Sequence, residues 1–89
     1  MPAPTDRQKQ NQYKRVTYAR EARARAERLT SDAKKCPCAQ CINAAHMAID
    51  AAVSAQTDAR LWAGRLYGHE RRHGFTLAIT TLEALRKAI

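Results

Sequence analysis

Glycine and proline are scarce in this sequence. There are three of each among 89 residues, and neither occurs between residues 6 and 35. Because these residues mark most turns, their scarcity excludes a fold of many short strands and loops. Strand-like alternation of apolar and polar residues is also absent. The chain is therefore predicted to be all-α, and it is too short for more than one domain.

Long apolar runs and large apolar side chains are also few. No run approaches the roughly 20 apolar residues of a membrane span. The first residues lack the apolar segment of a signal peptide, so we expect a cytoplasmic protein without membrane contacts. Hydrophobic residues make up 45% of the chain, but many are alanines. A core of this kind is marginal at this length, and a bound metal ion or a partner would strengthen it.

Recognisable catalytic motifs are limited to one short match. His69-Glu70-Arg71-Arg72-His73 fits the H-E-x-x-H pattern of zinc metalloproteases, in which two histidines one helical turn apart hold zinc and the glutamate is the general base. Here two arginines occupy the middle positions, which are usually uncharged in that family. Glu83 is the only downstream carboxylate that could serve as a third ligand. We interpret the match as coincidental and predict that the protein is not an enzyme, with a zinc hydrolase as a remote alternative.

Acidic residues are outnumbered two to one. The chain has 16 Lys and Arg against 8 Asp and Glu, for a net charge of +8. Residues 1–35 carry ten basic and four acidic groups, a net +6, whereas residues 36–89 carry six and four, a net +2. Such asymmetry favours contact with a polyanion, and a basic helix can neutralise nucleic-acid phosphates. The predicted nucleic-acid contacts are Lys14, Arg15, Arg20, Arg23, Arg25 and Arg28. A solvated basic face that only aids solubility is the alternative.

Helical periodicity is what the sequence has in abundance. After a tail of residues 1–5, Thr5 and Gln8 form a capping-box pattern at the start of a long basic helix, residues 6–35. Its apolar positions, mostly alanines, alternate at three and four residues and predict a narrow seam for a closely approaching helix: Ala19, Ala22, Ala26, Leu29 and Ala33. This seam could bind a protein partner or a second copy of the chain.

Residues 36–89 are predicted to form a helical hairpin followed by a short helix. Pro37 marks the start of a second helix that ends near Gln56, and Gln56-Thr57-Asp58 is typical of a turn. A third helix is expected over residues 58–72, antiparallel to the second. Gly74 then separates a fourth helix, residues 75–88, although one long helix kinked at Gly74 is an alternative.

The three cysteines of the chain lie within six residues, as Cys36-Pro37-Cys38-Ala39-Gln40-Cys41. Clustered thiols in a reducing compartment are typical of metal ligands, and zinc with mixed sulfur and nitrogen ligands is the default. Cu(I), an iron–sulfur cluster and simple buried thiols are the alternatives. The predicted hairpin would carry His69 and His73 to the cysteines, since Cys41 and His73 are equally far from Thr57.

Two ligand sets fit this prediction. One combines all three cysteines with a single histidine, His69 or His73. The other is a Cys2His2 set of Cys38, Cys41, His69 and His73, and His46 is a spare ligand in either case.

The sequence thus predicts a small basic protein, stabilised by zinc, that binds nucleic acid or a nucleic-acid-handling complex. The alternative is a protein-interaction module such as an adaptor, an inhibitor or a small subunit of a large assembly.

Overall fold

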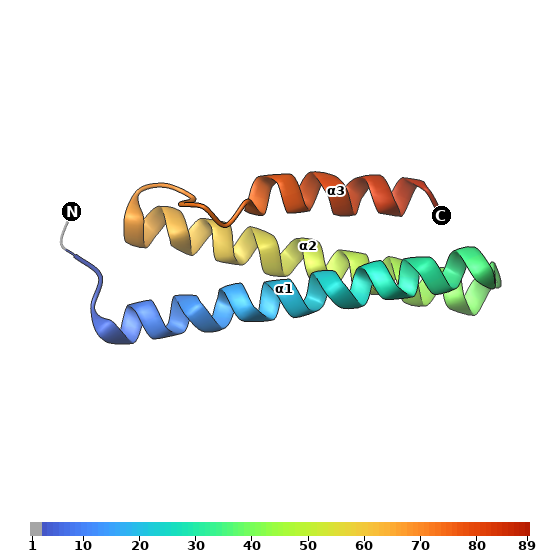
Figure 1. Cartoon of the computed structure of the whole chain (residues 1–89), viewed down its shortest axis with the longest axis horizontal. Helices are drawn as coiled ribbons and strands as arrows, with labels where there is room; N and C mark the ends of the chain where they lie inside the picture. The colour runs from blue at the N-terminus through green and yellow to red at the C-terminus, as the bar shows by residue number, and fades with distance from the viewer. Residues whose placement is uncertain (1–2) are drawn as a thin grey trace.

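The computed structural model describes residues 3–89, which form three helices joined by two short connections. The helices are α1 (Asp6–Lys35), α2 (Ala39–Tyr67) and α3 (Phe75–Lys87). The three helices lie along one long axis, and each runs antiparallel to the one before it (Figure 1). No strand occurs in residues 3–89, so the all-α prediction is confirmed. Of the predicted tail, residues 1 and 2 lie outside the described part, and residues 3–5 lead into α1 without helical structure.

The first helix begins and ends where the sequence predicts. The Thr5 hydroxyl accepts a hydrogen bond from the Gln8 N–H at 3.2 Å, and the Gln8 side chain accepts one from the Thr5 N–H at 2.8 Å. This capping box satisfies two of the backbone donors that a helix start leaves free. Lys34 and Lys35 lie in the last turn, where positive charge interacts favourably with the helix dipole.

The predicted turn at residues 56–58 does not exist, because α2 is one continuous helix of 29 residues. The Thr57 hydroxyl donates to the Val53 carbonyl oxygen at 2.8 Å, one turn earlier in the same helix, and caps nothing. Gln56 is buried and faces α1. The antiparallel hairpin of helices 37–56 and 58–72 is therefore wrong, and the hairpin in the structure is formed by α1 and α2 instead.

Alanines make up more than half of the buried residues of α1 and α2. The buried residues of the seam between these two helices alternate at three and four positions in both of them, as in coiled coils. In α1 they include Ala19, Ala26 and Ala33, and in α2 Ala45, Ala52, Ala59 and Ala63. Of the predicted docking seam, Ala19, Ala26 and Ala33 are buried, whereas Ala22 and Leu29 remain half-buried. Alanine lets the two backbones approach closely along nearly their whole length.

Two buried glutamines fix the register of this hairpin. The Gln12 side-chain amide donates to the Ala59 carbonyl oxygen at 2.9 Å, and the Gln56 amide donates to the Ala19 carbonyl oxygen at 2.8 Å. The two bonds run in opposite directions across the seam. A slip of one helix along the other would break both and leave buried amides unpaired, which is costly.

The large core side chains come mainly from α3 and the part of α2 that it covers. Phe75 packs with Val16, Ala59 and Ala63, and Leu82 packs with a second group around Ile49. Phe75, Ile49 and Leu82 are each at most 2% exposed, and each such burial is worth about 1.5–3 kcal/mol. Helix α3 therefore contributes the large buried apolar side chains that are scarce between α1 and α2.

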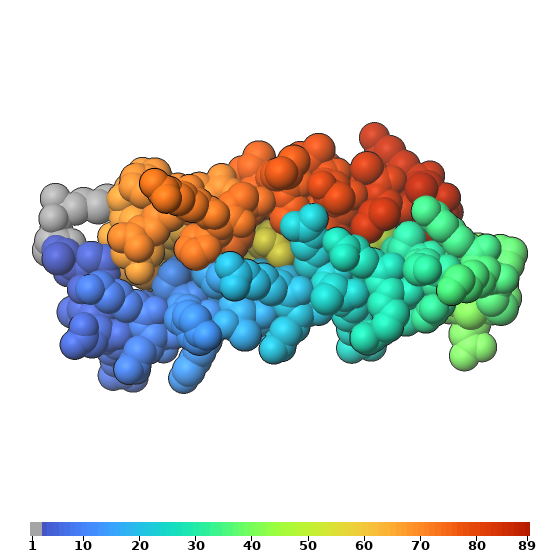
Figure 2. Space-filling view, viewed as in Figure 1, coloured from blue at the N-terminus to red at the C-terminus, as the bar shows by residue number. Residues whose placement is uncertain are grey.

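The described part of the molecule is a rod measuring 51 × 20 × 15 Å. On the face shown in Figure 2, α1 and α3 lie side by side, and atoms from the middle of α2 are visible between them. Within residues 3–89, none of the helices combines the length and the apolar character that crossing a membrane requires.

Candidate metal centre

The three cysteines lie at the tip of the rod where α1 joins α2: Cys36 and Cys38 are in the turn, and Cys41 is in the first turn of α2. Cys36 is the residue that caps the end of α1, and its N–H donates to the Asp32 carbonyl oxygen at 2.9 Å. Cys38 is the N-cap of α2, and its sulfur accepts a hydrogen bond from the Cys41 N–H at 3.3 Å. Pro37 lies between these two residues, and its ring restricts the backbone there. Chain geometry alone therefore brings the sulfur atoms together.

The sulfur atoms of Cys36, Cys38 and Cys41 form a compact group, here named the thiol cluster. All three lie within 4.8 Å of one another, and those of Cys36 and Cys38 are 3.9 Å apart. Cys36 and Cys38 are exposed and Cys41 is half-buried, so an ion can reach all three. The thiol cluster could hold a metal ion.

The thiols of Cys38 and Cys41 differ in pKa because they are hydrogen-bonded to each other. The Cys41 N–H and the Cys41 thiol both donate to the Cys38 sulfur, which lowers the pKa of Cys38. The same sharing raises the pKa of Cys41 to about 12, since its thiol donates to Cys38 and Cys36 and would lose these bonds as a thiolate. Of these two thiols, Cys38 is therefore the one that loses its proton more readily.

The spacing of the thiol cluster fits a metal bound to thiolates. With zinc–sulfur bonds of about 2.3 Å, two sulfurs of one tetrahedron are roughly 3.8 Å apart. The 3.9 Å separation of Cys36 and Cys38 already matches this value. In the part of the chain that is described, no histidine or carboxylate belongs to this group, so the chain offers three sulfur ligands there.

The predicted histidine ligands lie at the other end of the rod. Because α2 does not turn back at Thr57, nearly the whole length of this 29-residue helix separates the cysteines from His69 and His73. At about 1.5 Å per residue this is roughly 40 Å. Figure 1 shows the turn at residues 36–38 and the loop at residues 68–74 at opposite ends. Both ligand sets that include His69 or His73 are therefore wrong for this chain folded on itself.

The H-E-x-x-H match does not lie on a helix. Residues 68–74, here named the end loop, connect α2 to α3 between Gly68 (φ 80°) and Gly74 (φ 66°). Glu70 accepts hydrogen bonds from the Thr76 N–H at 2.9 Å and the Thr76 hydroxyl at 3.0 Å, so its carboxylate caps the start of α3. These bonds lower the pKa of Glu70. The two histidines are thus not one helical turn apart, as the metalloprotease pattern requires.

His46, the spare ligand of the prediction, is not part of the thiol cluster. It is half-buried in α2 and lines a cavity of about 440 Å³ together with Glu83, Arg86 and Ile89. Among the described residues, its Nε2 is the buried side-chain nitrogen or oxygen without a hydrogen-bond partner. This cavity lies between α2 and the C-terminal end of α3, and none of the three cysteines lines it.

The structure divides the predicted nucleic-acid contacts into two groups. Lys14, Arg20, Arg25 and Arg28 are exposed on α1. Arg15 and Arg23 are half-buried and already engaged. The Arg15 guanidinium stacks 4.3 Å from the centre of the Trp62 ring and lies 3.8 Å from the Asp58 carboxylate, whereas Arg23 pairs with Glu27 at 3.1 Å.

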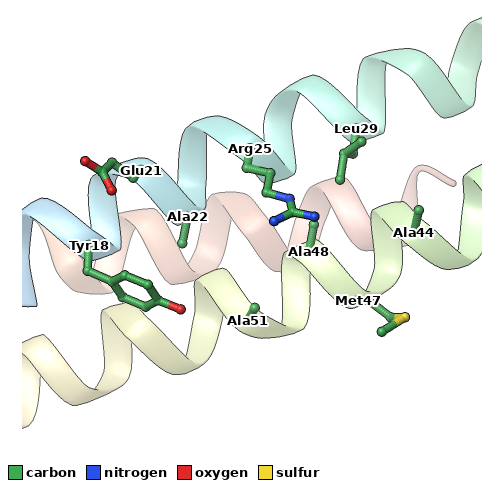
Figure 3. Close-up of a pocket in the computed structure, with 9 residues that line it drawn as sticks. All are labelled: Tyr18, Glu21, Ala22, Arg25, Leu29, Ala44, Met47, Ala48 and Ala51. Atoms are coloured by element: carbon green, nitrogen blue, oxygen red, sulfur yellow. The ribbon is translucent and has the colours of Figure 1, made fainter.

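An open groove between α1 and α2 was not anticipated from the sequence. It measures about 550 Å³ and has a floor of alanines, with the side chains of Tyr18, Arg25, Leu29 and Met47 around it (Figure 3). Helix α3 passes behind it in this view and contributes no lining residue. Tyr18 and Met47 are 61% and 74% exposed. Only the pairing of α1 with α2, which the sequence did not reveal, would have identified this groove.

Comparison with protein-family models, with curated protein sequences and with solved structures found no match to this chain. The function is therefore inferred from the residues of the chain and their geometry.

Proposed function

We propose that this protein binds a thiophilic metal ion, zinc in the first instance, through Cys36, Cys38 and Cys41. The observation that carries the proposal is the mutual approach of the three sulfur atoms within 4.8 Å at an accessible tip. A reducing compartment such as the cytoplasm would keep these thiols free to bind the ion. Two lysines in the last turn of α1, Lys34 and Lys35, add positive charge that favours thiolates nearby.

The cysteines would supply three thiolates, and the fourth position of a tetrahedral ion would face outward. Zinc sites with three protein ligands leave one position for water or another molecule. Cu(I) is also selected by thiolates, so the chemistry of the donors admits both ions. Each ligand must lose its proton before the metal binds, so affinity falls as the pH falls.

The Cys38→Ser variant tests this proposal because serine keeps the N-cap of α2 and removes one thiolate. Serine is among the best N-cap residues, so the fold should be retained. We expect zinc affinity to fall by about 100-fold or more, as measured by competition with a chromophoric chelator, because one of three ligands is lost. Cobalt(II) absorption bands should show sulfur ligation in the unmodified chain, and titration with Cu(I) identifies the preferred ion.

The His73→Ala variant is the matched control, and we expect it to bind zinc with unchanged affinity. A loss as large as that of Cys38→Ser would show that the ion is held by the Cys–His set that the sequence suggested. Absence of any stoichiometric binding to the fully reduced chain would refute the proposal altogether.

A second candidate function is association with nucleic acid along α1. The observation that favours it is a row of exposed basic residues along α1: Arg7, Lys14, Arg25, Arg28 and Lys35. Their spacing by three, seven and eleven residues keeps them on one side of the helix. Such a row can follow a phosphate backbone without reading its sequence.

Salt dependence tests the second candidate. With about four phosphates neutralised on duplex DNA, the logarithm of the binding constant should fall with the logarithm of salt concentration at a slope of roughly −3.6. Arg25→Gln combined with Arg28→Gln should flatten this slope by nearly two units. The control variant Arg60→Gln with Lys87→Gln removes the same charge from α2 and α3 and should keep the slope. Equal effects of both double variants would show that only net charge matters.

A further inference from the structure

The end loop carries a concave cluster of nitrogen donors that neither the thiol cluster nor the basic row of α1 includes. Its sequence is Gly-His-Glu-Arg-Arg-His-Gly, and a cavity of about 360 Å³ is lined by His69, Arg71, Arg72 and His73. All four side chains can donate N–H groups, and Glu70 is not among the lining residues. A cavity with this lining suits an anion and not a metal cation.

Three of the four donors are held in place by neighbours. The His69 Nδ1 accepts a hydrogen bond from the Arg71 N–H at 2.9 Å, so the proton of the neutral ring lies on Nε2, the nitrogen left free to donate. The Arg71 guanidinium stacks on the Tyr67 ring, 3.6 Å from its centre. The His73 ring lies 5.2 Å from that of Phe75, which is buried. Fixed donors lose little freedom when a ligand arrives.

The positive charge of this cavity is not neutralised from within the described part of the chain. Neither Arg71 nor Arg72 forms a salt bridge with any residue among 3–89. The nearest carboxylate in sequence, that of Glu70, is bound to Thr76 at the start of α3, where Arg60 also contributes to its low pKa. Arg71 also adopts a left-handed backbone conformation (φ 62°), which residues other than glycine rarely adopt.

We propose that the end loop binds a phosphate group through Arg71, Arg72 and the two histidines. Two guanidinium forks can bond the oxygens of a tetrahedral dianion, and the imidazoles complete the donor set. Free phosphate and the terminal phosphate of a nucleotide share this chemistry. The site is independent of the metal centre, because the two lie at opposite ends of the rod (Figure 1).

The test is a titration of the ¹⁵N-labelled full chain under reducing conditions, followed by NMR. Inorganic phosphate, AMP and adenosine are added separately, with chloride adjusted to keep the ionic strength constant. We expect saturable shifts at the amides of residues 69–74 with phosphate and AMP, and none with adenosine. AMP binding about tenfold or more tighter than phosphate, a difference of about 1.4 kcal/mol, identifies a nucleotide ligand, whereas equal affinities identify phosphate itself.

Arg72→Gln is the decisive variant, because Arg72 is exposed. Its replacement also leaves the hydrogen bond of His69 and the ring contacts of Arg71 and His73 in place. Losing one of two guanidinium groups should weaken phosphate binding about tenfold. Arg72→Lys, which keeps the charge, should lose less. The control Arg20→Gln removes an equally exposed arginine from α1 and should bind phosphate normally. Shifts spread along α1, or equal weakening in Arg72→Gln and Arg20→Gln, would overturn the proposal.

Discussion

Among single residues, Glu70 connects the end loop to the rest of the fold. No side chain at Gly74 can cap α3, and the Glu70 carboxylate takes that role from four residues earlier. Replacing Glu70 with alanine should therefore lower the free energy of unfolding at neutral pH by roughly 1 kcal/mol or less, because the cap is largely exposed. Urea denaturation followed by circular dichroism measures this difference.

The pH dependence of that loss follows from the pKa of Glu70, which folding lowers below its ordinary 4.5. A lowered pKa stabilises the fold above 4.5, and the contribution disappears as the pH falls through the folded-state value. The gap between the unmodified chain and Glu70→Ala should thus narrow under acidic conditions. Glu70→Gln retains an acceptor oxygen without the charge and should lose less at neutral pH. A gap that stays constant down to acidic pH would show that the carboxylate charge is not involved.

Between elements, the α1–α2 hairpin depends on its two buried glutamines. Gln56→Ala removes the bond to the Ala19 carbonyl oxygen and leaves a void in an otherwise close-packed seam. We expect a loss of about 1.5–3 kcal/mol in the free energy of unfolding. Gln40→Ala, at an exposed position of the same helix, should change it by less than about 0.5 kcal/mol. Comparable losses in both variants would show that the bond across the seam is not the source of the loss, since alanine favours the helix at both positions.

The same glutamine explains why the sequence predicted the wrong hairpin. A polar triplet of Gln56, Thr57 and Asp58 resembles a turn when each side chain is assumed to face water. In the structure Gln56 bonds across the seam and Thr57 bonds back along its own helix. Only the partner helix makes Gln56 a core residue, and periodicity within one helix cannot show which partner it has.

Features set by nearby residues were predictable, whereas those set by the fold were not. The capping box at Thr5, the end of α1 and the grouping of three sulfurs all depend on spacing within six residues or less, and the structure contains each of them. The positions of His69 and His73 depended on where a 29-residue helix was taken to turn. Because the predicted turn does not occur, His69 and His73 lie at the opposite end of the molecule from the cysteines.

Over the whole molecule, the location of the thiol cluster limits what a bound metal can do for stability. The cysteines are neighbours in sequence, so the ion closes only a very short segment of chain. Closing a short segment removes little entropy from the unfolded state, and the unfolded chain can bind the ion through the same six residues. The helices are held together along their length by the alanine seam and by α3 instead.

Metal removal should therefore leave the helices formed. If the ion bound only the folded state, a thousandfold excess over its dissociation constant would add about 4 kcal/mol. For a domain of this size, each kcal/mol raises the melting temperature by about 4–8 °C. Because the unfolded chain competes for the ion, we expect a rise below about 10 °C, with far-UV circular dichroism unchanged by a chelator. Loss of the helical signal on chelation would mean that the bound ion is required for the helices to form.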